Sequence, residues 1–342
     1  MVDNGPAELF PVDAVITWVD GADPAHKLKL DQYLASIGGA RPRAASSARF
    51  HNSGEIDYCV TSLLRFAPWI RTIFIVTDAQ IPELIYKLQG TRYEHKVKIV
   101  DHKTIFSGYE LHLPTFNSNS ISALLWKIPG LAENFLFLND DFALLRPVNE
   151  QDFFREQKVV LRGSWRKYSE LIFRTKIKLW FEKFISNNKN DIGQQKCSYS
   201  VGQELSAKHL GFKTYYFQVQ HNPHPWRRST LMAFFNANPK LLEFSVSYRL
   251  RSAKQFIIDA LAAHLELKQF GAITDNRLKT LQLKPNNQAL VRIQYKLAKA
   301  DCDPNTAFVC VQNIENASEK AQKIIFSWLD FRIGSIENLL QK

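Results

Sequence analysis

The residues with the clearest chemical potential are Asn139-Asp140-Asp141, which directly follow the apolar run 135–138. Paired carboxylates at the end of a strand can hold a divalent cation, which in turn binds a diphosphate, and one of them can act as a base. We therefore predict that Asp140 and Asp141 bind Mg²⁺ or Mn²⁺. A turn with two solvated acids is the alternative that this motif alone leaves open.

A second acidic position follows an earlier strand-like run. Residues 12–19 are largely apolar and β-branched and lead into Asp20-Gly21, a pair that is also common in ordinary turns. The carboxyl ends of parallel strands form the ligand-binding edge of an open sheet. We therefore expect Asp20 and Asp140 to emerge at the same edge.

Two pairs of basic side chains complete the candidate site. His221 and His224 are three residues apart around a proline, so both imidazoles could serve one site as base, phosphate contact or metal ligand. Arg249 and Arg251 are two residues apart, and in an extended segment they would share a face that could bind a diphosphate. A polar loop and a solvated basic face are the respective alternatives.

The elements that must position these residues alternate between strand and helix. Apolar runs predict buried strands at 12–19, 72–77, 97–100 and 135–138, and helical spacing predicts helices at 24–34, 55–66 and 117–126. Continuous apolar strands separated by helices are typical of a mostly parallel sheet with helices on both faces. The sequence therefore predicts an α/β fold.

The rest of the chain is basic and is expected to be mainly helical. Residues 161–254 contain 17 basic and 5 acidic residues, against 16 and 19 in residues 1–160. We predict a basic, aromatic-rich helix at 161–189, a strand at 214–220, and helices near 226–235, 253–266 and 317–341. The predicted organisation is an α/β half, 1–155, and a basic half, 156–342, in one catalytic unit.

The surplus of positive charge indicates an anionic partner. The stretch 162–189 is the candidate surface, either for anionic lipid or for a polyanionic polymer. The alternative is an amphipathic helix with its aromatic side chains in the core.

Composition excludes several classes of protein. A chain of 342 residues with 45% hydrophobic and 23% charged residues is neither disordered, collagenous nor coiled-coil. The four cysteines lack zinc-site spacing and indicate free thiols, although Cys302 and Cys310 could pair. No signal peptide and no apolar run of about 18–20 residues is visible. We expect a cytoplasmic chain whose membrane contact, if any, is peripheral at the inner face of the cell membrane.

Taken in order, these segments resemble the Stealth family. Its motif regions resemble, in turn, residues 13–24 around Trp18-Val19-Asp20-Gly21; residues 49–141, from Arg49-Phe50 through Leu113-Pro114-Thr115-Phe116-Asn117-Ser118 to Asn139-Asp140-Asp141; the shortened His221-Asn222-Pro223-His224; and Tyr248-Arg249-Leu250-Arg251-Ser252. The resemblance covers about residues 12–255.

The resemblance implies a fold and an activity. The family comprises bacterial capsular-polysaccharide hexose-phosphate transferases and the eukaryotic N-acetylglucosamine-1-phosphotransferase. It implies a nucleotide-sugar-transferase-like sheet whose first half binds the donor. The enzyme would move a hexose 1-phosphate, such as N-acetylglucosamine 1-phosphate, from a nucleotide-diphosphate sugar to a hydroxyl of a glycan or lipid-linked glycan. The product would be a phosphodiester-linked capsular or surface polysaccharide.

Roles for individual residues follow from the resemblance together with their chemistry. Asp140 and Asp141 are expected to bind a magnesium (or manganese) ion or the acceptor hydroxyl, and His221 is the expected base, with His224 as second choice. Arg249 and Arg251 are expected to bind the diphosphate, and Asp20 and Gly21 to support the donor. Thr115 and Asn117, before a helix, are expected to contact the sugar or a phosphate.

Three functions other than hexose-1-phosphate transfer are also compatible with the sequence. A conventional glycosyltransferase would cleave the sugar–phosphate bond and release a nucleoside diphosphate instead of a monophosphate. A basic nucleic-acid-binding protein would suit the net charge of +11 and bind with strong salt dependence. No recognised nucleic-acid motif is present, so we expect no such partner. A non-catalytic scaffold of a capsule-assembly complex is the third.

Overall fold

The central feature of the fold is a five-stranded sheet of order β10-β4-β1-β2-β3. The computed structural model describes residues 10–39, 41–46, 50, 52–172 and 198–341. The strands β1 (Val12–Thr17), β2 (Ile73–Thr77), β3 (Val97–Asp101) and β4 (Asn134–Asn139) are parallel, and β10 (His224–Arg227) is antiparallel to β4. The predicted α/β fold with a mostly parallel sheet is confirmed, as are its four predicted strands.

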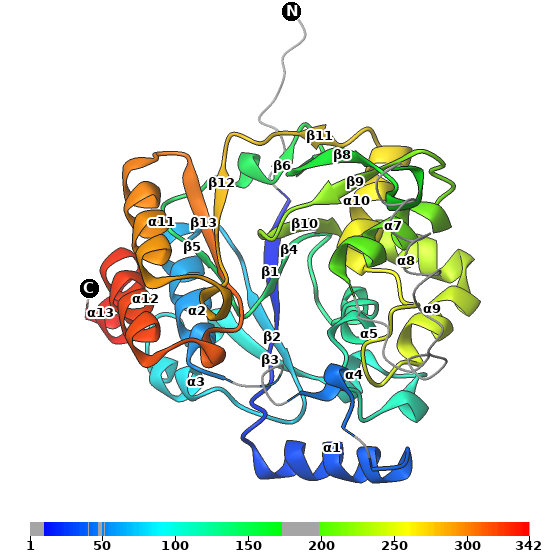
Figure 1. Ribbon diagram of the computed structural model, residues 1–342, viewed down its shortest axis with the longest axis horizontal. Helices are drawn as coiled ribbons and strands as arrows, with labels where there is room; N and C mark the ends of the chain where they lie inside the picture. The colour runs from blue at the N-terminus through cyan, green and yellow to red at the C-terminus, as the bar shows by residue number, and fades with distance from the viewer. Residues whose placement is uncertain (1–9, 40, 47–49, 51, 173–197, 342) are drawn as a thin grey trace, which may run out of the picture.

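Helices cover both faces of this sheet (Figure 1). They are α1 (Pro24–Ser36), α2 (Glu55–Phe66), α3 (Glu83–Leu88), α4 (His102–Ile105), α5 (Ser118–Ser122), α7 (Tyr199–His209), α8 (Arg228–Ala237), α9 (Pro239–Val246), α10 (Ile258–Gln269), α11 (Leu290–Cys302), α12 (Glu319–Arg332) and α13 (Ile336–Leu340). The predictions at 24–34, 55–66 and 226–235 are confirmed. The helix predicted at 317–341 is interrupted at Gly334, whose φ of +80° favours glycine. Within the described residues, no helix is long and apolar enough to cross a membrane.

The strands are buried on both faces because successive side chains point to opposite sides. Ala14 and Ile16 of β1 pack in one core cluster with α2, while Val15 between them packs in another with α10. Residues 136 and 138 of β4 join the first cluster, and residues 135 and 137 the second. This alternation explains why the strands read as continuous apolar runs.

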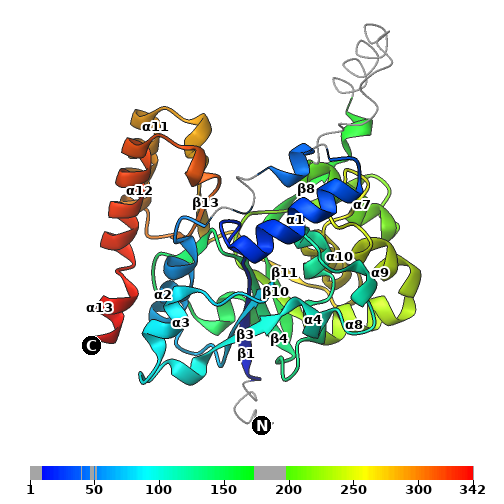
Figure 2. The ribbon, with the colours of Figure 1, turned by 90° about the horizontal axis from the view of Figure 1, so that it is seen from below.

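Strands from the second half of the chain complete the architecture. In one small sheet, β13 (Thr306–Val311) pairs with β12 (Lys279–Leu283) and, antiparallel, with β5 (Phe142–Leu144). In another, β7 (Lys158–Leu161) lies between β6 (Phe154–Arg155) and β11 (Ile273–Thr274). Helices α11, α12 and α13 lie together on one flank of the molecule (Figure 2). The division into 1–155 and 156–342 stays a prediction, although β10 and β13 pair with strands of the first half.

The prediction of a helix at 161–189 is wrong for its first residues. Residues Gly163–Lys167 form the strand β8, antiparallel to β9 (Tyr215–Val219), which lies at the strand predicted for 214–220. A Cβ atom on Gly163 would lie 2.3 Å from the carbonyl oxygen of Gln218, so glycine permits this close approach. Long-range pairing therefore overrides the local pattern. The remainder of the predicted helix, from 173 on, lies outside the described residues, and its proposed membrane contact stays a prediction.

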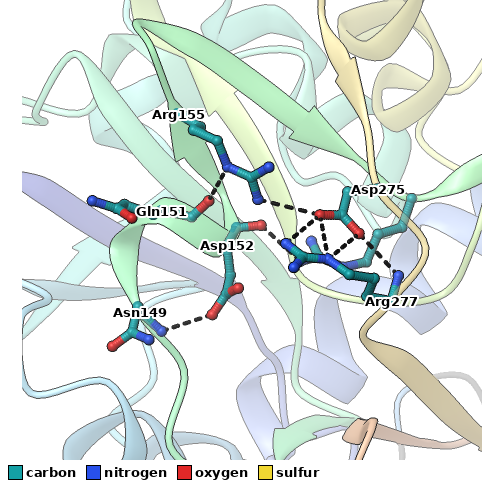
Figure 3. Close-up of polar contacts among 7 residues, drawn as sticks. Asn149, Gln151, Asp152, Arg155, Asp275 and Arg277 are labelled. Carbon is teal, nitrogen blue, oxygen red and sulfur yellow. Dashed lines mark hydrogen bonds and ion pairs between the residues drawn. The ribbon is translucent and has the colours of Figure 1, made fainter.

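One ion-pair cluster joins β6 to the loop after β11 (Figure 3). Arg277 and Arg155 both donate to Asp275 Oδ2, at 2.7 and 3.2 Å, and these hydrogen bonds, above all that from Arg277, hold the pKa of Asp275 well below its usual range. A carboxyl whose pKa is lowered on folding stabilises the fold above the pKa of its unfolded form, about 4, and loses that contribution as the pH falls.

We expect Asp275→Asn to lower the free energy of unfolding by about 1–3 kcal/mol at pH 7, with a smaller difference from the parent below pH 4. Urea unfolding at several pH values measures both effects. Glu170→Gln is the control, because the Lys208–Glu170 pair is exposed and its loss should leave stability unchanged. Equal effects of the two substitutions would contradict the expectation.

Candidate active site

A cavity of about 680 Å³ lies where β1 and β4 end at their carboxyl termini. Thr17 pairs with Asn139, so the two strands deliver their following loops to the same edge, as the sequence predicts for Asp20 and Asp140. The lining includes these predicted site residues: Thr115, Asp140, Asp141, His221 and Arg251. They come from both halves of the chain.

Asp140 and Asp141 form the acidic end of the cavity. Burial, and secondarily the charge of Asp141, raises the pKa of Asp140 well above its usual value. Burial raises the pKa of Asp141 to about 7, and the nearby Glu55 adds to the shift in both carboxyls. The free thiol of Cys310 donates to Asp141 Oδ2 at 3.6 Å, whereas the buried Asp141 Oδ1 has no partner. The two carboxyls therefore lie together in a buried place that disfavours their ionised forms.

This arrangement fits a divalent cation. Carboxylate oxygens are hard ligands, and a cation would relieve their repulsion and supply a partner for Asp141 Oδ1. Over the described residues, no group of three His, Cys, Asp or Glu side chains is arranged as a metal site. Two carboxylates with the remaining positions left to phosphate oxygens and water are typical of magnesium.

His221 lies in the same cavity and stacks on Tyr199, with ring centroids 4.4 Å apart. Burial lowers the pKa of His221 to about 4, with further lowering by the neighbouring His224 and Lys284. The imidazole is therefore neutral at physiological pH and has a nitrogen able to accept a proton.

A polar network lies beside this histidine. Tyr199 Oη donates to Asp259 Oδ2 at 3.1 Å, and His224 Nε2 lies 3.7 Å from the same oxygen. His224 is buried, does not line the cavity, and stacks against Phe137 of β4. It therefore supports the cavity wall through Asp259 and Phe137, both of which do line the cavity.

The two arginines have different surroundings. Arg251 lines the cavity, and its Nη2 donates to Ser118 Oγ at 2.5 Å. Arg249 does not line the cavity; its Nη2 donates to the carbonyl oxygen of Leu111 at 2.8 Å, and its guanidinium lies over the Tyr33 ring. Arg249 and Leu250 lie in a bend and no strand forms at 249–252, so the expected shared face does not form.

Three further predicted residues hold the backbone near the cavity without lining it. Asp20 exchanges two backbone hydrogen bonds of 2.8 Å with the Gln80 side chain. A Cβ atom on Gly21 would lie 2.5 Å from Cβ of Phe50, so glycine allows the two segments to touch. Asn117 is buried, caps the five-residue helix α5, and donates to Tyr248 and Gln255. These three positions are structural supports in this arrangement.

Sequence reasoning missed several residues of the cavity. Glu55 begins α2 and faces the two aspartates; Tyr199 and Asp259 flank the histidines; and Asn313 and Asn316 approach from the loop after β13. Glu55 follows Gly54 within the second motif region, which is the one local signal among them. The others reach the cavity only through tertiary packing.

The comparisons with known proteins concern mainly the first half of the chain. Residues 10–38 match Stealth protein CR1, conserved region 1, and residues 49–161 match Stealth protein CR2, conserved region 2. An exopolysaccharide phosphotransferase of Streptomyces coelicolor is 46% identical over 146 residues, which are 42% of this chain and 15% of that protein. A capsular polysaccharide phosphotransferase of Actinobacillus pleuropneumoniae is 41% identical over 156 residues, 45% of this chain and 41% of that protein. The chain thus matches less than half the length of these relatives.

Solved structures of low sequence identity also match. The bifunctional glycosyltransferase WbbM, in its apo form, has a TM-score of 0.43 at 10% identity, covering 95% of this chain and 52% of that one. Mouse xyloside xylosyltransferase 1 has a TM-score of 0.39 at 11% identity, covering 88% of this chain and 97% of that one. The sequence matches are the specific ones: the segments that match conserved regions 1 and 2 of Stealth proteins contain β1 to β4 and the Asp140-Asp141 pair.

Proposed function

We propose that the protein is a hexose-1-phosphate transferase, which moves a sugar phosphate from a nucleotide-diphosphate sugar to a hydroxyl of a glycan or lipid-linked glycan. The observation that carries the proposal is one cavity that combines an acidic pair, a neutral histidine and an arginine. The relatives' names, capsular and exopolysaccharide phosphotransferases, support the same chemistry.

In the proposed reaction, the acceptor hydroxyl attacks the phosphorus atom that carries the sugar. The new P–O bond forms as the bond to the bridging oxygen of the diphosphate breaks, and a nucleoside monophosphate leaves. His221 takes the proton of the hydroxyl, and Arg251 binds the phosphoryl oxygens on which negative charge increases. Catalysis of this kind depends mainly on positioning and electrostatics.

Asp140 and Asp141 would hold a magnesium or manganese ion in this proposal. When bound, such a cation neutralises the diphosphate and makes the monophosphate a better leaving group. Their adjacent positions at the end of β4 support a diphosphate site at this edge of the sheet.

Phosphorus NMR of the products tests the function directly. The protein, with magnesium, is incubated with a panel of nucleotide sugars and a capsule-derived glycan acceptor. A phosphodiester signal together with a nucleoside monophosphate is expected with one donor. Release of a nucleoside diphosphate without a phosphodiester would instead indicate a conventional glycosyltransferase and overturn the proposal.

The arginines provide a graded prediction. We expect Arg251→Ala to raise KM for the donor about 10–100-fold, because a charge-assisted hydrogen bond to phosphate contributes about 1.5–3 kcal/mol. Arg249→Ala, whose side chain is bound outside the cavity, should change KM by less than about threefold. Initial rates over a range of donor concentrations measure both, and a larger effect at Arg249 would refute the assignment.

A further inference from the structure

The end of the cavity away from the aspartates contains hydrogen-bonding atoms that have no partner. They belong to side chains that line the cavity and are at least nine-tenths buried: His26 Nε2, both ring nitrogens of His102, and Thr115 Oγ1. Each unpaired buried polar atom costs about 1–3 kcal/mol. The fold thus retains a set of unsatisfied groups at one place, as expected where a ligand supplies the missing bonds.

The polar atoms at this end are imidazole nitrogens and a hydroxyl oxygen, which can donate or accept hydrogen bonds. Burial lowers the pKa of His102 to about 4, so its ring is neutral and offers one donor and one acceptor. His26 Nδ1 lies 3.2 Å from Asp78 Oδ2, and Lys29 compensates that carboxylate at 2.8 Å. The Asp78 carboxylate at this end is thus paired with two side chains, in contrast to the acidic end.

The shape of this end suits a flat ring. The rings of Phe50 and Phe116 line it, and each meets the imidazole of His26 edge to face, with centroids 5.6 and 5.4 Å away. His102 follows β3 and Asp140 follows β4, which are separated by three strand intervals of about 4.8 Å, or about 14 Å in all. An extended nucleoside diphosphate has a length of this order.

We propose that His26, His102 and Thr115 form the subsite for the base of the nucleotide, a heterocycle recognised by hydrogen bonds. The inference rests on the proposed function and deepens it, because it names the part of the donor that this end of the cavity selects. The diphosphate lies toward Asp140 and Asp141, and the base lies against His102 and the aromatic rings. His26 Nε2 and both nitrogens of His102 have no partner in the protein, and in this proposal the base supplies their missing hydrogen bonds.

His102→Phe tests the subsite, because it keeps a flat ring and removes both nitrogens. The control is His264→Phe, another buried neutral histidine outside the cavity lining. His264 accepts from the Phe217 amide at 2.8 Å and bonds the Ala260 carbonyl at 2.6 Å, so both its nitrogens are used by the fold. The probes are UMP, CMP, GMP, AMP and magnesium pyrophosphate, with binding measured by calorimetry and stability by thermal unfolding.

We expect the parent protein to prefer one base and His102→Phe to bind that nucleotide at least tenfold more weakly, with pyrophosphate binding and ligand-free Tm retained or Tm raised. His264→Phe should lower Tm and keep the nucleotide affinity. Unchanged nucleotide affinity and selectivity in His102→Phe would overturn the subsite, even where the parent makes a phosphodiester. A parent that binds no nucleotide would overturn the subsite and the proposed function together.

Discussion

Asp140→Asn is expected to lower kcat for hexose-phosphate transfer by about 10³-fold or more. The substitution keeps the size of the side chain but removes the charge that, with Asp141, would bind the cation. Loss of a metal that stabilises phosphoryl charge removes several kcal/mol of transition-state stabilisation, and each 1.4 kcal/mol is a factor of ten in rate. Asp140 also lines the cavity directly after β4.

The measurement is single-turnover transfer at saturating donor, with magnesium affinity determined in parallel. Asp101→Asn is the matched control, since Asp101 also stands at the end of a parallel strand but caps α4 and does not line the cavity. Asparagine caps helices as well as aspartate does, so this variant should keep its activity. Full turnover by Asp140→Asn would remove the metal assignment, and with it the reason for placing the diphosphate at this edge.

The sequence predicts this edge well because the governing physics is local. A strand buried on both faces must be apolar at nearly every position, so β1, β2 and β4 can be recognised as uninterrupted runs. Parallel pairing then brings the residues after each run to one edge, and the register of Thr17 with Asn139 does so here. Fold class and the location of the acidic pair follow from these two facts.

The rest of the site depends on contacts between residues far apart in the chain. Tyr199 reaches His221 and Asp259 because α7 and α10 pack together, which no periodicity around residue 199 encodes. The spacing of Arg249 and Arg251 also did not predict their arrangement, because residues 249–252 form no strand and only Arg251 lines the cavity. The strand β8 likewise exists through its pairing with β9, where Gly163 admits the neighbouring backbone.

Buried polar groups were the least predictable part, and they distinguish two kinds of histidine. His264 and His102 are both buried with a pKa of about 4, yet the first has both nitrogens bonded by the fold and the second has neither. Nothing in their sequence surroundings separates them. Only the hydrogen bonds of the folded chain distinguish the two: His264 stabilises the structure through both nitrogens, whereas those of His102 have no partner and are proposed to bind a ligand.

His221→Gln is expected to lower kcat by about 10²–10⁴-fold with little change in donor KM, which is the contribution typical of a general base. The pKa of His221 is about 4, so the parent holds the neutral, proton-accepting form throughout the range above pH 5. Its kcat at saturating magnesium should therefore stay constant above that pH and fall only as the pH drops through about 4. In the variant, the acceptor must lose its proton to the solvent, so the rate should rise with increasing pH.

The pH dependence of kcat distinguishes a general base from a residue that only positions the cavity wall, whereas a rate measured at one pH does not. His224→Gln is the comparison, because His224 is buried behind the cavity wall near Asp259 and should affect the rate without changing the shape of the profile. If His221→Gln kept a flat profile, His221 would be a positioning residue, stacked on Tyr199 to hold the wall. If the parent's rate instead fell through a pKa between about 6 and 7, a group other than His221 would control the rate, and Asp141, with a pKa of about 7, would be the first candidate.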